Sequence, residues 1–527
     1  MSTAPAAKPK KRRWRAKIVL LSISLGIALL FGEAVLRAKD GYGLFSLRLQ
    51  HVMAGGDAAG QLAFNREWID PFVEQLAGER EDLDPDWLAT SPAPLPPQPK
   101  LDKPLLDQQL WLFHYYLTNE ALLRNFWVKG QGLPMFPGLE MPDEFTVFSP
   151  PGGKITPRYR YPASRELPSG LTTNAFGFRG RQLEVDKPEK TIRIAFVGAS
   201  TTVEMAALPH SAPELIEHWL NLWAQTQGLA VRFETLNAAR EAIQSHDIRA
   251  IVEDELLPLA VDYVVYYEGA NQLQPSHLLP HVAIEGEYQL SAPPPGLIGI
   301  FDGTESAETT WLDRLSSFSA IARNLRSIGR DSQPLTEPAK PTQTVVLAEG
   351  LDQDPFPLER AAELLQLGAI GTDLDAIQRA LTSIDAQLVM CTFSWLAYDG
   401  LAVDPVFGHN IHVQLNRAYW PFRYETVERL AALQNRFYRA FAQQHGLDVI
   451  DIAGLLPRDE RLYLDAIHQT ELGVRLKAWL LFASLTTIVS RDLESGRVPV
   501  PDTNPDASHP NIGTERSLSR EQLDGGR

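Results

Sequence analysis

Five short hydrophobic runs recur from residue 192 onward, and amphipathic stretches separate them. The runs are rich in β-branched and aromatic residues, as is typical of strands covered on both faces, and they occupy 192–198, 231–237, 262–269, 386–393 and 447–452. The stretches between them carry apolar side chains at helical spacing and predict helices at 211–227, 246–260, 428–444 and 471–485. This alternation predicts an α/β fold, a three-layer αβα sandwich with a central parallel sheet and ligands at the carboxyl ends of its strands.

A separate apolar run, 18–36, follows seven basic residues in the first 17 positions, which contain no acidic residue. As a helix this run is about 28 Å long, close to the roughly 30 Å of a hydrocarbon core. A cleaved signal peptide has the same order of charge and apolar residues, but the length of the run without a small-residue cleavage site favours a retained anchor. The positive-inside rule then predicts a cytoplasmic tail at 1–17, a single transmembrane helix at 18–36 and an extracytoplasmic remainder, periplasmic in a Gram-negative cell.

The remaining segments differ from the α/β pattern. Residues 37–171 are expected to be an extracytoplasmic juxtamembrane and Pro-rich accessory region, in which six prolines from Pro85 to Pro99 indicate a stiff spacer. The α/β domain is expected at 172–490, with an insertion at about 272–385 between its third and fourth strands. Residues 491–527 lack a hydrophobic period and are expected to be disordered.

Charge and cysteine content restrict the classes of partner. The chain has 527 residues, 49 basic and 65 acidic, and a net charge of −16; without the seven basic residues of the tail the balance is 42 against 65. An acidic body repels a phosphate backbone, so we expect no nucleic-acid partner. The lone Cys391 lies in an apolar run and cannot form an internal disulfide or a thiolate metal site, so we expect it to be a small core residue.

Three segments carry candidate chemistry. Ser200 follows the predicted strand 192–198. Gly198 lets the backbone turn sharply there, so the Ser200 hydroxyl would lie at the rim of the sheet, where a nucleophile is needed. A turn or a helix cap fits the same residues. Asn271 follows the third strand and could donate an N–H to an oxyanion. Asp465 and His468 lie on one turn before the last helix. The ordered set is harder to obtain by chance than any one member.

This order resembles that of the SGNH hydrolases, also called GDSL-type esterases and acylhydrolases, over about residues 172–486. The preface TTNAFGFRG at 172–180 looks like the N-x-x-GFRG segment of many membrane-linked bacterial members. The nucleophile block of the family matches residues 198–201, its oxyanion Asn block matches 269–271, and its DxxH block matches 465–468.

The resemblance implies a role for each matched residue. Ser200 would be the nucleophile, His468 the general base, and Asp465 the carboxylate that orients the imidazole. The oxyanion hole would consist of the Ser200 N–H, the Asn271 side chain and the backbone N–H of Ala239, where the family has glycine. An alanine at that position would be strained if the site required a positive φ.

Two further departures from the family concern neighbouring residues. Ala199 and Gln272 replace aspartates that are frequent in the family, and we expect these changes to alter local support more than proton transfer. Glu204, four residues after Ser200, could line a pocket, but we expect a solvated carboxylate near a helix start.

Other candidate residues have simpler interpretations. Three aromatic residues near strand ends could form a platform for an acyl group or a sugar, and core packing is the preferred interpretation: Tyr266, Tyr267 and Trp395. Two histidine pairs have the spacing of metal ligands: His277 with His281, and His409 with His412. No Asp, Glu or Cys cluster accompanies them in the sequence, so we expect neither a metal ion nor another cofactor.

The combined hypothesis is a membrane-anchored, extracytoplasmic serine esterase that removes a short acyl group, with O-acetyl the expected one, through an acyl-enzyme on Ser200. Its partners would be an acyl ester, such as an acylated glycan, and the membrane. Two alternatives stay open: an O-acyltransferase acting on a cell-envelope or exported glycan, and a non-catalytic glycan-binding or assembly factor that retains the fold.

Overall fold

The structure is a computed structural model of the whole chain. It describes mainly residues 11–39, 80–92, 172–204, 210–273, 357–397 and 424–500, together with short strands and single positions elsewhere. The chain divides into two compact units. The first consists of Met1–Met53, Met135–Met141 and Asp302–Thr336, and the second consists of the other residues.

A five-stranded parallel sheet forms the centre of the second unit. Its strands are β4 (Thr191–Gly198), β5 (Arg232–Asn237), β6 (Tyr263–Tyr267), β9 (Gln387–Cys391) and β10 (Asp448–Ile450). They lie in the order β10-β9-β6-β4-β5, and every neighbouring pair is parallel. All residues of β4, β6 and β9 are buried, which explains their continuous hydrophobic sequences. The five expected strands are therefore confirmed.

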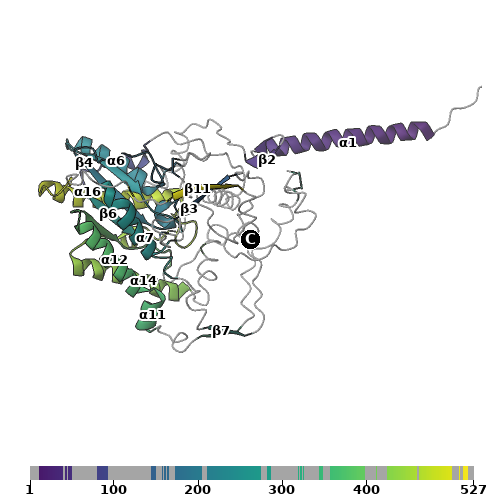
Figure 1. Cartoon of the computed structure of the whole chain (residues 1–527). Coiled ribbons are helices and arrows are strands. Elements are labelled where there is room, and N and C mark those ends of the chain that lie inside the picture. The colour runs from purple at the N-terminus through teal and green to yellow at the C-terminus, as the bar shows by residue number, and fades with distance from the viewer. Residues whose placement is uncertain are drawn as a thin grey trace, which may run out of the picture. The chain divides into compact units, whose positions relative to one another are not determined.

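Helices cover both faces of this sheet (Figure 1). On one face, α6 (Ala212–Thr226) packs against α16 (Glu471–Glu494), and on the other lie α7 (Ser245–Ile251), α12 (Leu367–Thr382) and α14 (Tyr424–His445). Helix α6 begins at the expected capping box, formed by Ser211 and Glu214. Trp219 of α6 meets Trp479 of α16 edge to face, with ring centroids 5.5 Å apart. The predicted three-layer αβα sandwich is confirmed.

Short elements connect the layers. The single turns α5 (Ser200–Val203) and α15 (Ile452–Leu455) follow β4 and β10, and α7 continues through η3 (Val252–Leu256) and η4 (Leu257–Leu259). The crossover from β6 to β9 contains the antiparallel strands β7 (Val282–Glu285) and β8 (Thr344–Leu347), followed by α11 (Leu358–Leu364) and α12. Because α12 packs against α7 and β9, the last part of the expected insertion, 272–385, is a crossover helix of the sandwich itself.

Part of the Pro-rich region also packs into the second unit. The 3-10 helix η1 (Pro85–Ala89) buries Trp87 and Leu88, and the Trp87 ring lies 6.2 Å from that of Phe482 in α16. Arg475 of α16 donates to the Leu88 carbonyl at 2.8 Å. The expected spacer therefore contains, at 80–92, a segment that is part of the domain.

Described structure continues beyond residue 491. Helix α16 continues to Glu494, and Val498 and Val500 are buried. Strand β11 (Thr514–Ser519) pairs antiparallel with β3 (Glu144–Ser149). The expectation that disorder begins at 491 is therefore wrong for residues 491–500, where apolar side chains after α16 are buried although their spacing does not reveal it.

The first unit contains α1 (Lys11–Lys39), which includes the whole predicted apolar span, and the antiparallel pair β1 (Tyr42–Gly43) and β2 (Ser46–Leu49). Glu33 of α1 pairs with Arg37 at 2.7 Å and accepts hydrogen bonds from the Ser319 hydroxyl and the Ile321 N–H at 2.9 and 3.0 Å. Among the described residues, two stretches are long and apolar enough to cross a membrane. Lys17–Arg37 is unburied, whereas α16 is a core helix.

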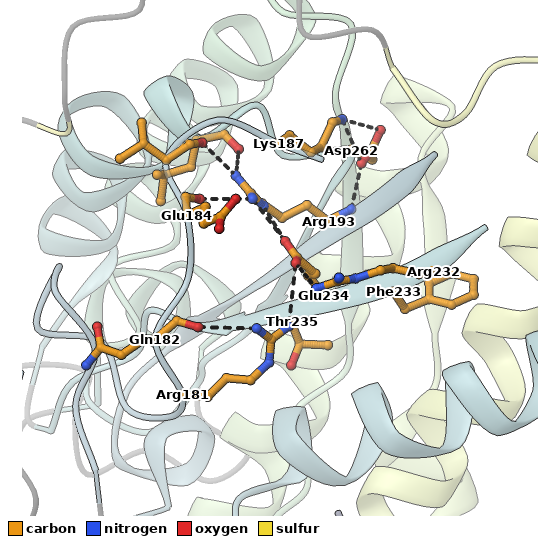
Figure 2. A network of polar contacts seen from close by, with 12 residues as sticks. Arg181, Gln182, Glu184, Lys187, Arg193, Arg232, Phe233, Glu234, Thr235 and Asp262 are labelled. Atoms are coloured by element: carbon orange, nitrogen blue, oxygen red, sulfur yellow. Dashed lines mark hydrogen bonds and ion pairs between the residues drawn. The ribbon is translucent and has the colours of Figure 1, made fainter. Parts of the chain in front are cut away.

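A buried network of charges closes the amino-terminal edge of the sheet (Figure 2). Arg193 of β4 pairs with Glu234 of β5 at 2.9 Å, and the Arg193 backbone N–H donates to Asp262 at 2.6 Å. Lys187 also pairs with Asp262, at 3.1 Å, and the Val500 N–H donates to the same carboxylate at 2.6 Å. Because the strands are parallel, this network lies opposite their carboxyl ends and leaves that edge for other residues.

At its carboxyl end β4 approaches its neighbours closely. A Cβ on Gly198 would collide with the Tyr267 carbonyl oxygen and the Thr202 hydroxyl. These two groups are hydrogen-bonded to each other at 2.7 Å, so neither can move away freely. The sharp turn into α5 therefore requires glycine at this position.

Replacing this glycine is expected to destabilise the protein. Gly198→Ala should lower the free energy of unfolding by about 2 kcal/mol or more, since the extra methyl group overpacks the strand end. Gly368→Ala is the matched control, because the space around Gly368 in α12 is open and alanine favours a helix by up to about 1 kcal/mol. Urea unfolding of the purified chain measures both, and equal stability of the two variants would contradict the constraint at Gly198.

Candidate active site

The predicted site residues gather where the strand order of the sheet reverses. The chain passes from β4 to β5 on one side and then returns to β6 on the other, so the carboxyl ends of β4 and β6 border the crevice in which such sheets bind ligands. Ser200 begins α5 directly after β4, Ala239 follows β5, and Asn271 follows β6. Asp465 and His468 lie in the segment that leads into α16.

Ser200, His468 and Asp465 form a continuous chain of hydrogen bonds. His468 Nε2 lies 2.8 Å from Ser200 Oγ, and His468 Nδ1 lies 2.7 Å from Asp465 Oδ2. The other carboxylate oxygen of Asp465 accepts the backbone N–H groups of Ile467 and His468 at 2.9 and 2.8 Å. Because an ionised carboxylate can only accept, Nδ1 carries the proton in the neutral imidazole and Nε2 presents its lone pair to the serine hydroxyl.

The charges of this pair favour proton uptake by the imidazole. Burial lowers the pKa of His468, but the Asp465 carboxylate raises it by more, so the His468 pKa lies above its ordinary value. Burial raises the pKa of Asp465, and the charge and hydrogen bonds of His468 outweigh that effect, so the Asp465 pKa lies below its ordinary value. The histidine can therefore take a proton from Ser200 while the aspartate stays ionised.

Donors for an oxyanion surround the same edge. The Asn271 side-chain amide donates to the Ile243 carbonyl at 3.0 Å, which fixes the amide and leaves its second hydrogen for a ligand. Ala239 is buried and has a negative φ, so the alanine in place of the family glycine introduces no backbone strain. Together with the Ser200 N–H, these groups can stabilise a developing negative charge.

Glu268, at the end of β6, is a site residue that sequence reasoning missed. Its carboxylate accepts the Asn271 N–H at 2.9 Å and also the N–H groups of Gly269 and Ala199. Burial raises the pKa of Glu268 to about 7, although these N–H groups oppose the rise. Glu268 thereby ties the turn before Ser200 to the loop that carries Asn271. Gln272, by contrast, supports α7, because its side chain donates to the Ser245 hydroxyl at 2.8 Å.

The expectation of a solvated Glu204 is wrong. The side chain of Glu204 is 3% exposed and pairs with Lys477 of α16 at 2.5 Å. Arg179, from the preface, donates to the backbone carbonyls of Val203 and Glu204. The available signal was Lys477 itself, because a charge inside the apolar pattern of a core helix requires a buried partner.

The other candidates lie apart from this chemistry. Tyr266, Tyr267, Trp395 and Cys391 are buried, and Tyr267 stacks on Phe393 with ring centroids 5.0 Å apart, so the aromatic residues pack in the interior. Four histidines lie outside the described residues: His277, His281, His409 and His412. Within the part of the chain that the structure describes, no group of three His, Cys, Asp or Glu side chains could hold a metal ion.

Comparison with solved structures finds similar esterases. An acetyl xylan esterase, AlAXEase, is 14% identical over 56% of this chain and 100% of its own, with a TM-score of 0.29. An acetyl xylan esterase from Geobacillus stearothermophilus is 11% identical over 56% and 94%, with a TM-score of 0.30. A GDSL-like lipase from Bacteroides thetaiotaomicron is 7% identical over 57% and 88%, with a TM-score of 0.26. No family model and no curated relative matches the sequence.

The electrostatic coupling of the histidine and the aspartate can be measured directly. Asp465→Asn should lower the pKa of His468, because it removes the carboxylate that stabilises the imidazolium while keeping the shape of the side chain. NMR titration of protein labelled at histidine 13Cε1 reports this pKa. In the matched control, Asp375→Asn removes the carboxylate 3.3 Å from His445 and should leave His468 unchanged. A His468 pKa that is the same in Asp465→Asn and wild type would contradict the coupling.

Proposed function

We propose that this chain is an SGNH-type serine esterase, held at a membrane by α1 and acting outside the cytoplasm on short acyl esters. The observation that carries the proposal is the hydrogen-bonded chain Ser200–His468–Asp465 at the carboxyl edge of the sheet. A serine hydroxyl within 2.8 Å of an imidazole whose other nitrogen is held by an ionised carboxylate has the arrangement required for nucleophilic acyl transfer.

In the proposed reaction, Ser200 Oγ attacks the ester carbonyl carbon while His468 Nε2 accepts the serine proton. Asp465 stabilises the imidazolium that forms and holds its orientation. The oxyanion of the tetrahedral intermediate accepts hydrogen bonds from the N–H groups of Ser200 and Ala239 and from the Asn271 side chain. His468 then returns the proton to the departing alcohol, which leaves an acyl group on Ser200.

Water completes the reaction by the same route. His468 removes a proton from the water as it attacks the acyl-enzyme, and Ser200 regains its proton when the carboxylic acid leaves. An O-acyltransferase would use the same acyl-enzyme with a glycan hydroxyl in place of water. The proposed acyl group is a short one, and acetyl is the first to test.

The proposed location rests on the first unit. The stretch Lys17–Arg37 is apolar, unburied and long enough to span a membrane, and basic residues precede it. The positive-inside rule orients this end toward the cytoplasm, which directs the α/β domain to the other side. Glu33, near the far end of the span, pairs with Arg37 at 2.7 Å and so does not enter the membrane as an isolated charge.

The proposed mechanism predicts ester hydrolysis that depends on Ser200 and His468. The full chain in detergent should hydrolyse p-nitrophenyl acetate and react with a fluorophosphonate probe at Ser200. Ser200→Ala and His468→Ala should each reduce hydrolysis by at least about a thousandfold. Ser484→Ala, which changes a helix serine whose hydroxyl donates to the Leu480 carbonyl, is the control and should keep full activity. Equal background signals from wild type and Ser200→Ala would contradict the esterase and leave a strictly acceptor-dependent transferase or a binding or assembly factor.

The fate of the acyl group separates esterase from acyltransferase. With an acetylated glycan as donor and an unacetylated glycan as acceptor, the esterase should release acetate at a rate that does not depend on the acceptor. Mass spectrometry of the glycans and assay of free acetate measure both products. Acetyl transfer that depends on acceptor concentration, with little free acetate, would contradict the esterase hypothesis and support the acyltransferase.

A further inference from the structure

The turn that carries Ser200 is held by side chains from outside it. A single helical turn such as α5 has too few internal hydrogen bonds to keep its own shape. The carbonyl oxygens of its later residues accept from three buried side chains: Thr201 from Lys477 at 2.6 Å, Thr202 from Asn237 at 3.2 Å, and Val203 and Glu204 from Arg179. The position of Ser200 is therefore set by α16, by the end of β5 and by the preface.

Lys477 contacts more than the Ser200 turn. Its side chain is 1% exposed, and its ammonium group lies 2.5 Å from Glu204 and 4.8 Å from the centre of the Tyr267 ring. The same group donates to the Gln469 side-chain oxygen at 3.0 Å. The ammonium group thus donates hydrogen bonds to Thr201 and Gln469 and forms an ion pair with Glu204.

The contact with Gln469 connects Lys477 to the other half of the site. Gln469 follows His468 directly, and its amide also donates to the Ile467 carbonyl at 2.8 Å. One buried cation thus touches both the turn that begins at Ser200 and the segment that carries His468. These two segments are 268 residues apart in the sequence.

We propose that Lys477 is the positioning residue that holds Ser200 and His468 in register. The proposal rests on the proposed function for its kinetic consequences, but not for its effect on the histidine. Lys477 touches no substrate atom in this scheme and acts only through the two segments that it joins.

The charges around His468 determine the direction of the electrostatic effect. Asp465 and Glu241 raise the pKa of His468, whereas Lys477 lowers it, and the charge of His468 in turn lowers the pKa of Glu268. Removal of the Lys477 charge should therefore raise the His468 pKa further. Burial raises the pKa of Glu204, so loss of Lys477 alone would also leave an unfavourable carboxyl group in the interior.

The test removes the whole ion pair while keeping its shape. Lys477→Met/Glu204→Gln replaces both charged groups by neutral ones of similar size. The matched control is Lys187→Met/Asp262→Asn, which neutralises an ion pair that is equally buried, 3% and 0% exposed, at the opposite edge of the sheet (Figure 2). Near-ultraviolet circular dichroism of the full chains in detergent shows whether each variant keeps the native packing.

Two measurements are expected to change in the first variant and not in the control. NMR titration of 13Cε1-labelled histidine should give a higher pKa for His468. Hydrolysis of p-nitrophenyl acetate should show a kcat at least about a hundredfold lower, with KM little changed, because misplacement of reacting groups acts on the chemical step. If the first variant fails to fold, a third variant, Gln469→Met, takes its place. It removes the hydrogen bond from Lys477 to the histidine segment, together with the one from Gln469 to the Ile467 carbonyl, and should also lower kcat.

The outcomes separate this proposal from the proposed function. A folded Lys477→Met/Glu204→Gln protein with the wild-type His468 pKa and wild-type kcat would overturn the positioning role, as would equal changes in the Lys187→Met/Asp262→Asn control. A wild-type chain that neither hydrolyses the ester nor reacts with the probe would overturn the esterase function instead. In that case the His468 titration still decides whether Lys477 acts on the histidine.

Discussion

The parallel pairing of β4 with both β5 and β6 is the constraint on which the site depends. Three strands that run in the same direction deliver their following loops to one edge, so Ser200, Ala239 and Asn271 arrive together although each belongs to a different loop. Gly198 lets β4 end against the backbone of β6. His468 completes the group only because α16 packs across the same layer and brings the segment before it to Ser200.

Buried charges fix both ends of this sheet. Removing Lys477 and Glu204 from water costs several kcal/mol for each ion, and close pairing with additional hydrogen bonds must offset that cost. At the amino-terminal edge, Arg193 and Lys187 meet their carboxylates under the same condition (Figure 2). Such pairs tolerate little displacement, because a separated partner would be a buried unpaired charge. The segments that they join are therefore held in one register.

The hydrophobic pattern of the sequence was sufficient to predict the αβα sandwich, but not the segments around Trp87 and Val500 that pack against it. The strands are predictable because burial on both faces demands continuous β-branched and aromatic sequences, and α6 because Ser211 and Glu214 form a capping box visible three residues apart. The packing of Trp87 and the burial of Val500 were missed. Isolated apolar residues among prolines or after a helix have no period, so only the surface that they meet decides whether they are ordered.

For the candidate site, the sequence by itself determined the candidate reactive groups and their order along the chain: Ser200, Asn271, Asp465 and His468. These residues lie at the ends of strands or before a helix, and such boundaries can be recognised from the local sequence. Only the tertiary structure decided that Glu204 is buried, that Lys477 is its partner and that Glu268 joins the Ser200 turn to the Asn271 loop. The physical reason is that ion pairing and burial depend on distances through space between segments far apart in sequence, which no local pattern encodes.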